Sequence, residues 1–121
     1  MKGGETLALA GGLGAGKTTF IQGLAEGIGI NARINSPTFI LMRKYTAKNN
    51  YFYHLDLYRL EGDVNKEVEN LGLFDIWQGS KNIVAIEWAE KIREIMPKEV
   101  IWIKFENIGE EERKITSEAL Y

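Results

Sequence analysis

The sequence predicts an α/β domain built on a mixed β-sheet. Short apolar runs typical of buried strands alternate with stretches of helical periodicity. A glycine-rich loop joins the first such strand to the first helix, and two pairs of segments are spaced as β-hairpins. At 121 residues, the chain is expected to be a single domain, residues 1–121, with one modest core.

Composition and charge favour a soluble protein with an anionic ligand. The chain is 45% hydrophobic and 26% charged, and no apolar run approaches the roughly 20 residues of a membrane span. The absence of cysteine and of a secretory signal fits a reducing compartment, so we expect a cytoplasmic protein without membrane contact. Residues 1–60 carry seven Lys/Arg against three Asp/Glu, a net charge of +4. That excess suits an anion, although the charged outer faces of helices explain it equally well.

The first two elements are a strand and a helix on either side of the glycine-rich loop. Residues 5–10 ("ETLALA") form an apolar run bounded by glycines, which predicts a buried strand. After the loop, five apolar side chains fall on one helical face, and Gly29 stands where a C-cap glycine is expected. The five are Phe20, Ile21, Leu24, Ala25 and Ile28.

A hairpin and a capped helix are predicted in the middle of the chain. Segments 38–47 and 51–58 are rich in strand-forming residues and are separated by the polar "KNN", so we expect them to pair antiparallel. The polar stretch 62–72 is predicted to be helical, with Asp63 as its N-cap and Gly72 as its stop.

The remaining elements complete the alternation of strands and helices. They are a short helix at 73–77, a strand at 82–88, a helix at 89–97, and a terminal hairpin of strands 100–107 and 113–120. In the last helix, Ile92, Ile95 and Met96 fall on one face before Pro97 ends it.

The loop after the first strand matches the phosphate-loop pattern G-x-x-x-x-G-K-[ST], as Gly11, Gly16, Lys17 and Thr18. Glycines let backbone N–H groups approach phosphate oxygens, and the N-terminus of the next helix directs its dipole at the same anion. Lys17 can then reach the β- and γ-phosphates, and the Thr18 hydroxyl can bind Mg²⁺.

Two other interpretations of the loop are disfavoured. A plain glycine turn with an exposed lysine does not require the strand before it and the helix after it. A dinucleotide loop needs a glycine where Lys17 stands, and an acid about 20 residues later that the chain lacks. The loop therefore predicts a P-loop NTPase-like, three-layer domain with a mixed, mostly parallel central sheet and a β-hairpin insertion. No N-K-x-D string indicates guanine, so ATP is the expected nucleotide.

Two acids end apolar runs and are candidates for the metal and the attacking water. Asp56 ends "YFYHLD" and Glu87 ends "NIVAIE", and each can hold Mg²⁺ or orient water if its strand ends beside the loop. The alternative is that each acid merely ends its strand at the surface, and which acid takes which role stays open. Thr38 in "SPTF" is either a switch threonine that senses the γ-phosphate or a turn residue after Pro37.

Three further residues admit both a functional and a packing interpretation. Trp88 lies either against the base or in the core, and Arg59 pairs with a phosphate or with a strand-end acid. His54 is the sole histidine, so it cannot form a multi-histidine metal site. We interpret it as a packed strand residue.

Five strings together resemble the TsaE family (YjeE in older usage), the bacterial ATPase of tRNA threonylcarbamoyladenosine biosynthesis. They are "GLGAGKTTF", "SPTF", "HLDLYRL", "LGLFDIW" and "IEW", in this order and spacing. The resemblance covers Gly4 to about Ala119, and "SPTF" with "HLDLYR" after a phosphate loop is highly specific.

The resemblance implies a weak, Mg²⁺-dependent ATPase that works with the proteins TsaB and TsaD to form threonylcarbamoyladenosine at position 37 of tRNA. TsaD would carry out the transfer itself, and this chain would meet tRNA only through the assembly. The implied nucleotide-binding residues are Gly11, Gly14, Ala15, Gly16, Lys17, Thr18, Thr19 and Trp88. The implied catalytic residues are Lys17, Thr38, Asp56 and Glu87, and the implied Mg²⁺ ligands are Thr18 and Glu87.

The sequence departs from the family pattern at two places. Gly12 stands where the family usually has an acid, which we expect to change loop flexibility more than phosphate contact. Family members usually carry about one further helix and a strand-leading segment before residue 2, so part of the base pocket or a sheet-covering element is expected to be missing.

Two other function classes remain as alternatives. A small-molecule kinase usually has a mobile lid rich in arginine, but the segment between Leu60 and Asn82 is acidic. A nucleotide-gated binding module without significant hydrolysis is compatible with every motif above.

Overall fold

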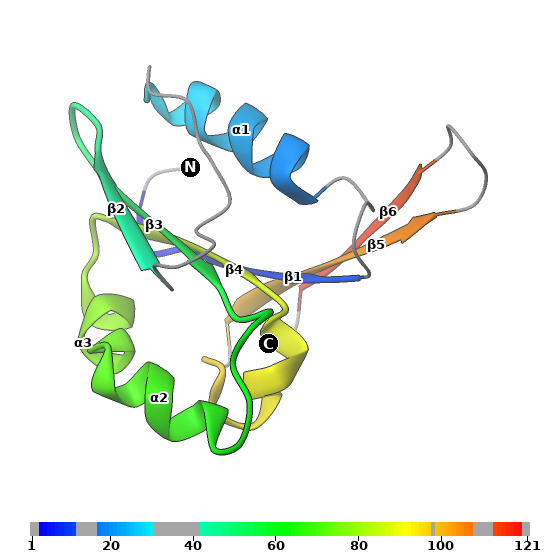
Figure 1. The fold of residues 1–121 in the computed structure, drawn as a ribbon. Coiled ribbons are helices and arrows are strands. Elements are labelled where there is room, and N and C mark those ends of the chain that lie inside the picture. Colours follow the sequence, from blue (N-terminus) through cyan, green and yellow to red (C-terminus); the bar gives the residue numbers. More distant parts are fainter. Residues whose placement is uncertain (1–2, 12–16, 31–41, 98, 108–112, 120–121) are drawn as a thin grey trace.

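One six-stranded sheet organises the described part of the chain, in the order β2-β3-β4-β1-β5-β6 (Figure 1). The structure is a computed structural model and describes residues 3–11, 17–30, 42–97, 99–107 and 113–119. The strands are β1 (Thr6–Ala10), β2 (Met42–Thr46), β3 (Tyr51–Asp56), β4 (Asn82–Glu87), β5 (Val100–Asn107) and β6 (Arg113–Ala119).

The centre of the sheet is parallel and its two edges are antiparallel hairpins. β3, β4, β1 and β5 run in the same direction, while β2 pairs antiparallel with β3 and β6 with β5. The predicted mixed, mostly parallel sheet is therefore confirmed. β3 is shorter than the predicted 51–58, because the Asp56 Oδ1 accepts a hydrogen bond from the Tyr58 backbone N–H (3.0 Å) and turns the chain away.

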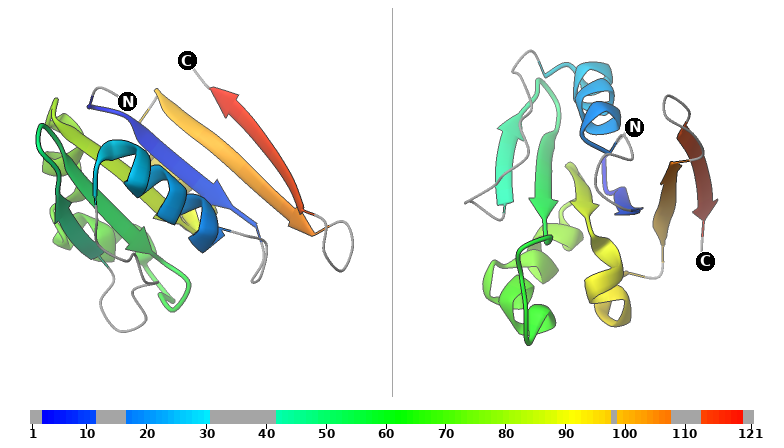
Figure 2. Two further views of the ribbon diagram at one scale, coloured as in Figure 1. Left: turned by 90° about the horizontal axis from the view of Figure 1, so that it is seen from above. Right: turned by 45° about the vertical axis from the view of Figure 1, so that its right-hand side comes forward.

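Helices cover both faces of the sheet and make three layers (Figures 1 and 2). α1 (Lys17–Ile28) runs over the central strands on one face. α2 (Val64–Asn70), α3 (Leu73–Gln78) and the 3-10 helix η1 (Ala89–Ile95) lie on the other. None of these helices combines the length and the apolar character that a membrane crossing requires.

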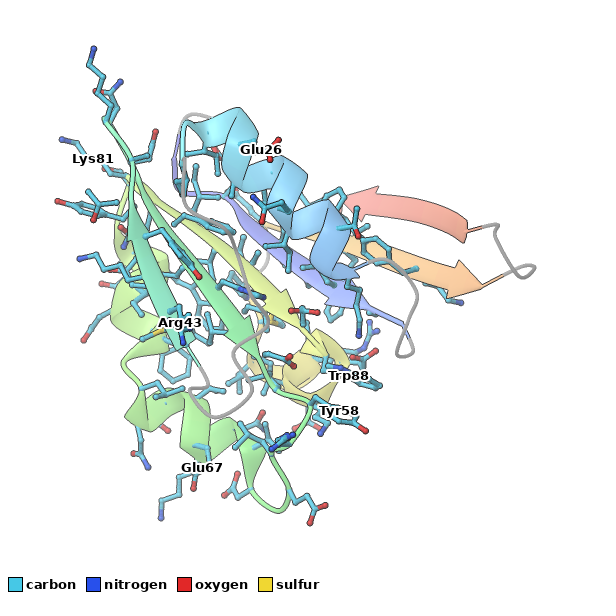
Figure 3. All side chains as sticks on the ribbon, turned by 45° about the horizontal axis from the view of Figure 1, so that its top comes forward. Glu26, Arg43, Tyr58, Glu67, Lys81 and Trp88 are labelled. Atoms are coloured by element: carbon cyan, nitrogen blue, oxygen red, sulfur yellow. The ribbon has the colours of Figure 1, made fainter. Side chains whose placement is uncertain are left out.

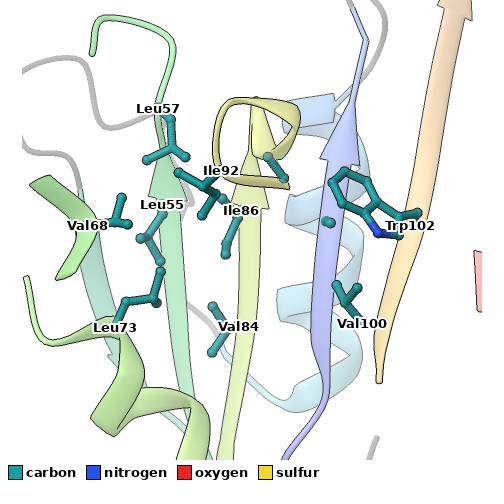
Figure 4. Close-up of a cluster of buried hydrophobic side chains, with 11 residues drawn as sticks. Leu55, Leu57, Val68, Leu73, Val84, Ile86, Ile92, Val100 and Trp102 are labelled. Atoms are coloured by element: carbon teal, nitrogen blue, oxygen red, sulfur yellow. The ribbon is translucent and has the colours of Figure 1, made fainter. Parts of the chain in front are cut away.

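Each face of the sheet has its own apolar core, as strand alternation requires. Under α1, residues such as Leu9, Phe52 and Phe105 pack against Ile21 and Ala25. On the opposite face, Figure 4 shows the cluster beneath α2, α3 and η1. Its larger members include Leu55, Leu57, Val68, Leu73, Ile86 and Ile92.

The predicted helix boundaries are confirmed at their caps. Gly29 has φ of +102°, and the Ile30 N–H donates to the Ala25 carbonyl at 2.9 Å, the bond that closes a Schellman cap. Asp63 caps α2 by accepting a hydrogen bond from the Lys66 N–H at 3.2 Å. Gly72, with φ of +83°, separates α2 from α3.

The helix predicted at 89–97 is a 3-10 helix that ends at Ile95 and bends at Ile92 (φ −124°, ψ 28°). The predicted apolar face is confirmed, because Ile92 is buried and both Ile95 and Met96 pack against the same cluster. Residues spaced by three and four lie close together in both kinds of helix, so this pattern does not distinguish them.

Candidate functional site

The site lies where the parallel strands β1, β3 and β4 reach their carboxyl ends. Glu87, the last residue of β4, is in register with Asp56 on one side and with Leu9 on the other. The loop that follows β1 begins at Gly11. In open α/β sheets, ligands bind at this edge.

Strand alternation brings the polar residues of this edge to the face covered by α1. Phe52 and Ala85 belong to the core under α1, so His54 and Glu87, two residues further along each strand, share their face. Asp56 is in register with Glu87 and follows His54 by two positions. Both acids therefore end strands on the side of the sheet from which Lys17 starts its helix.

Gly11 is the one described residue of the loop before Lys17, and its position requires glycine. It has φ of +136°, and a Cβ there would lie 2.4 Å from the carbonyl oxygen of Phe105. The chain therefore passes too close to β5 for any side chain. The Gly11 carbonyl accepts a hydrogen bond from the Lys17 Nζ at 2.7 Å, which closes the ends of the loop on each other.

Lys17 is buried, with 5% of its surface exposed, although it carries a charge. Its ammonium lies 4.0 Å from the centre of the Trp88 ring, a cation–π contact. Burial lowers the pKa of Lys17, and the negative charges of Glu87, Glu90 and Asp56 oppose that shift. A desolvated ammonium in this position gains free energy when an anionic ligand reaches it.

Glu87 is also buried, and its carboxylate is within hydrogen-bond distance of His54. The His54 Nε2 lies 2.6 Å from the Glu87 Oε2, and the two side chains are 0% and 4% exposed. The interpretation of His54 as packed in its strand omitted this bond. Its spacing two residues before Asp56 places His54 on the same face of the strand as that acid, but the bond to Glu87 depends on the pairing of β3 with β4.

Trp88 adopts a left-handed backbone conformation (φ 60°, ψ 36°), and it is the one non-glycine residue with positive φ in the described ranges. Such a conformation is costly for a bulky residue and is often found at functional sites. The Tyr58 ring lies against the indole, with ring centres 5.1 Å apart and an angle of 38° between the ring planes (Figure 3). Sequence reasoning did not anticipate Tyr58 as this partner.

A lysine on η1 holds the segment after β3 next to this aromatic pair. The Lys91 Nζ donates to the carbonyl oxygens of Tyr58 (2.8 Å) and Leu60 (2.9 Å). Nothing in the sequence pattern distinguished Lys91 from the other charged residues of its helix.

Several predicted residues lie outside the described part of the chain. Gly14, Ala15, Gly16 and Thr38 belong to undescribed ranges. Thr18 and Thr19 lie in the first turn of α1; Thr19 is exposed, and the side chain of Thr18 is not described. The structure therefore brings together Gly11, Lys17, Asp56, Glu87 and Trp88 from the predicted set.

The residues of the edge fit a Mg²⁺ ion that arrives with a nucleotide. The described residues contain no cluster of three or more His, Cys, Asp or Glu side chains able to hold a metal ion. Mg²⁺ bound with nucleotides typically uses one or two protein groups, with phosphate oxygens and waters as its other ligands. The carboxylate of Glu87, whose Oε2 lies 2.6 Å from the His54 Nε2, offers one such group.

The comparisons with known proteins agree on one family. The family model "Threonylcarbamoyl adenosine biosynthesis protein TsaE" matches residues 1–115. A tRNA threonylcarbamoyladenosine biosynthesis protein TsaE from Bacillus subtilis is 43% identical over 119 residues, which cover 98% of this chain and 72% of that protein. A protein of the same name from Nostoc is 49% identical over 92 residues, 74% of this chain.

A solved structure has the same fold over the whole chain. The crystal structure of Bacillus subtilis YdiB superimposes with a TM-score of 0.79 at 37% sequence identity, covering 100% of this chain and 72% of that one. The chain spans 72% of the Bacillus relative and 55% of the Nostoc relative.

Proposed function

The chain belongs to the TsaE family of threonylcarbamoyl adenosine biosynthesis proteins, and from this premise we propose that it binds and slowly hydrolyses Mg²⁺–ATP in support of a TsaB–TsaD assembly. That assembly forms threonylcarbamoyladenosine at position 37 of tRNA. In this proposal the chain acts in the cytoplasm and meets tRNA only through its partners.

One observation carries the ATP-binding part of the proposal. Lys17 is buried at the carboxyl edge of the parallel strands, in the electrostatic field of Glu87, Glu90 and Asp56. A buried cation surrounded by acids is suited to an anion that brings its own metal, because the metal compensates the acids while the lysine binds the phosphate.

In this proposal Lys17 stabilises the charge of the phosphates, and other residues of the site position water and the γ-phosphate. The Lys17 ammonium has three N–H donors; Gly11 takes one, and a phosphate oxygen is the natural acceptor for another. Negative charge that develops on the phosphates during transfer is stabilised there without reorganisation, because the ammonium is already desolvated and fixed. Asp56 and Thr38 would orient water or sense the γ-phosphate.

Mg²⁺ would be held by Glu87 and by the hydroxyl of Thr18. When bound, it neutralises charge on the phosphates and orients them for in-line attack. Trp88 and Tyr58 form an aromatic pair at the same edge, and we assign Trp88 to the neighbourhood of the nucleotide.

The described segment between β3 and β4 does not have the character of a kinase lid. The segment between β3 and β4 folds into α2 and α3, and their residues Val68 and Leu73 are buried in the core. A segment that contributes core side chains cannot open and close as a phosphate lid without exposing them to water.

The test is phosphate release from ATP, measured with and without purified TsaB–TsaD. We compare the wild type with Lys17→Ala, and with Lys66→Ala as a matched control, because Lys66 is exposed on α2. Release that the partners stimulate, that Lys17→Ala abolishes and that Lys66→Ala preserves is the expected result. Phosphorylation of an added metabolite would identify a kinase, and ATP binding without release would identify a nucleotide-gated binding module.

A further inference from the structure

His54 is buried on β3 with an imidazole that bonds to one acid of the site. It has no exposed surface, and its Nε2 lies 2.6 Å from the Oε2 of Glu87. Its other ring nitrogen, Nδ1, is buried without a hydrogen-bond partner among the described residues. The bond to Glu87 is therefore the one polar interaction that the described part of the chain gives this ring.

The tautomer of His54 sets the direction of the hydrogen bond. Opposite an ionised Glu87 carboxylate, which only accepts, the proton of the bond lies on Nε2 and the Glu87 Oε2 receives it. A polar ring buried with one nitrogen unpaired is less favourable at this position than an apolar side chain of the same size. Its neighbour two residues earlier, Phe52, shows that this face of β3 accepts apolar side chains.

We infer that His54 is a positioning residue for Glu87, holding one carboxylate oxygen so that the other is presented to the metal–nucleotide complex. This inference rests on the proposed function, because it gives Glu87 a ligand to meet. The glutamate side chain has three rotatable bonds, and a bond to a ring fixed in the core removes most of that freedom. His54 itself does not touch the ligand.

The first test reads the hydrogen bond directly and needs no activity. His54 is the only histidine in the chain, so protein labelled with ¹⁵N-histidine gives a single imidazole spectrum by NMR. We expect a protonated Nε2 whose proton exchanges slowly with water. Glu87→Gln should shift this proton markedly, and the exposed-site control Lys66→Ala should leave it in place.

The second test separates positioning from packing. His54→Leu fills the core without a donor, whereas His54→Gln offers an amide N–H at a similar reach. We expect His54→Leu to lower kcat for ATP hydrolysis by about 10- to 100-fold, with a smaller change in KM. His54→Gln should recover much of that loss. In a protein that already carries Glu87→Gln, adding His54→Leu should lower kcat little further, because the carboxylate that His54 positions is no longer present.

Three results would overturn the inference: an unprotonated Nε2, equal losses in His54→Leu and His54→Gln, or additive losses in the double variant. If His54→Leu fails to fold, the NMR test on the wild type and on Glu87→Gln still decides. The proposed function fails on a different result, ATP hydrolysis that survives Lys17→Ala. That failure would leave the NMR signature of the His54–Glu87 bond intact.

Discussion

Lys17 places a charge where the core of the protein disfavours it. Its pKa is lowered by burial, and three carboxylates only partly oppose the shift. The protein therefore gives up stability to keep a desolvated ammonium at the edge of the sheet. This is the cost expected of a group that is prepared for an anion before the anion arrives.

Lys17→Met should change how stability depends on pH. Because the folded pKa is lowered, the unfolded chain binds more protons between that pKa and the ordinary lysine pKa, so wild-type stability rises with pH through this window. Relative to Lys17→Met, the wild type should gain about 1.4 kcal/mol for each unit of lowering. Urea unfolding at neutral and alkaline pH measures this, and the exposed-site variant Lys66→Met, which keeps Lys17, should show the same slope as the wild type. Equal slopes in all three proteins would contradict the prediction.

Gly11 should tolerate a side chain far less well than Gly29. Both have positive φ, so alanine costs about 1–2 kcal/mol at either position. At Gly11 the new Cβ would also lie 2.4 Å from the Phe105 carbonyl oxygen, whereas at Gly29 no atom of the described residues lies within 4 Å of it. We expect Gly11→Ala to be the less stable variant by at least about 1 kcal/mol in denaturant unfolding. Equal stabilities would show that the chain after β1 shifts freely away from β5.

At the residue scale, the sequence predicts which charged side chains belong to the site but not which side chains contact one another. Lys17, Asp56 and Glu87 follow from a loop pattern and from acids that end apolar runs. The His54–Glu87 bond depends on the register of β3 against β4, and these strands are separated by two helices in the chain. The left-handed backbone conformation of Trp88 cannot be predicted from the sequence either, because tryptophan has no preference for it.

At the scale of the elements, capping residues allow most helix boundaries to be predicted from the sequence. Gly29, Asp63 and Gly72 each satisfy a local requirement of the backbone, and each stands where the sequence predicts it. Two elements differ from their predicted bounds. β3 ends early because the Asp56 side chain accepts a hydrogen bond from the Tyr58 N–H, and η1 has a backbone bend at Ile92. Hydrophobic periodicity reports the buried face of such elements and not how tightly they are wound.

Lys91 joins η1 to the segment after β3, so its removal should lower the stability of both. Lys91→Met keeps most of the side-chain volume but leaves the carbonyls of Tyr58 and Leu60 without their donor. We expect a loss of about 1–3 kcal/mol in the free energy of unfolding. Near-ultraviolet circular dichroism should also weaken, because the Tyr58–Trp88 pair is no longer held in one geometry. Unchanged stability and spectrum would mean that the stacking alone holds this segment.

At the scale of the whole molecule, the sequence predicts the fold class and the two hairpins but not the strand order. Hairpins are local, and the phosphate-loop pattern implies a three-layer domain. The insertion of β4 between β3 and β1 is a long-range pairing that no local pattern specifies. It is also the pairing that forms the site, because it places Glu87 between Asp56 and the chain leaving β1. The family resemblance, which rests on strings spread along the chain, is confirmed over residues 1–115.

The site and the fold are coupled, so the nucleotide should stabilise the whole domain. Lys17 enters the electrostatic field of Glu87 only when β1, β4 and α1 are assembled, and the unfolded chain offers no equivalent site. A ligand that binds only the folded state at 100 times its Kd adds about 2.7 kcal/mol to the free energy of unfolding. Thermal unfolding with increasing Mg²⁺–ATP should show this gain in the wild type and in Lys66→Met, but not in Lys17→Met. Stabilisation that persists in Lys17→Met would place the nucleotide elsewhere on the molecule, because this variant lacks the buried ammonium that the proposal gives to the phosphates.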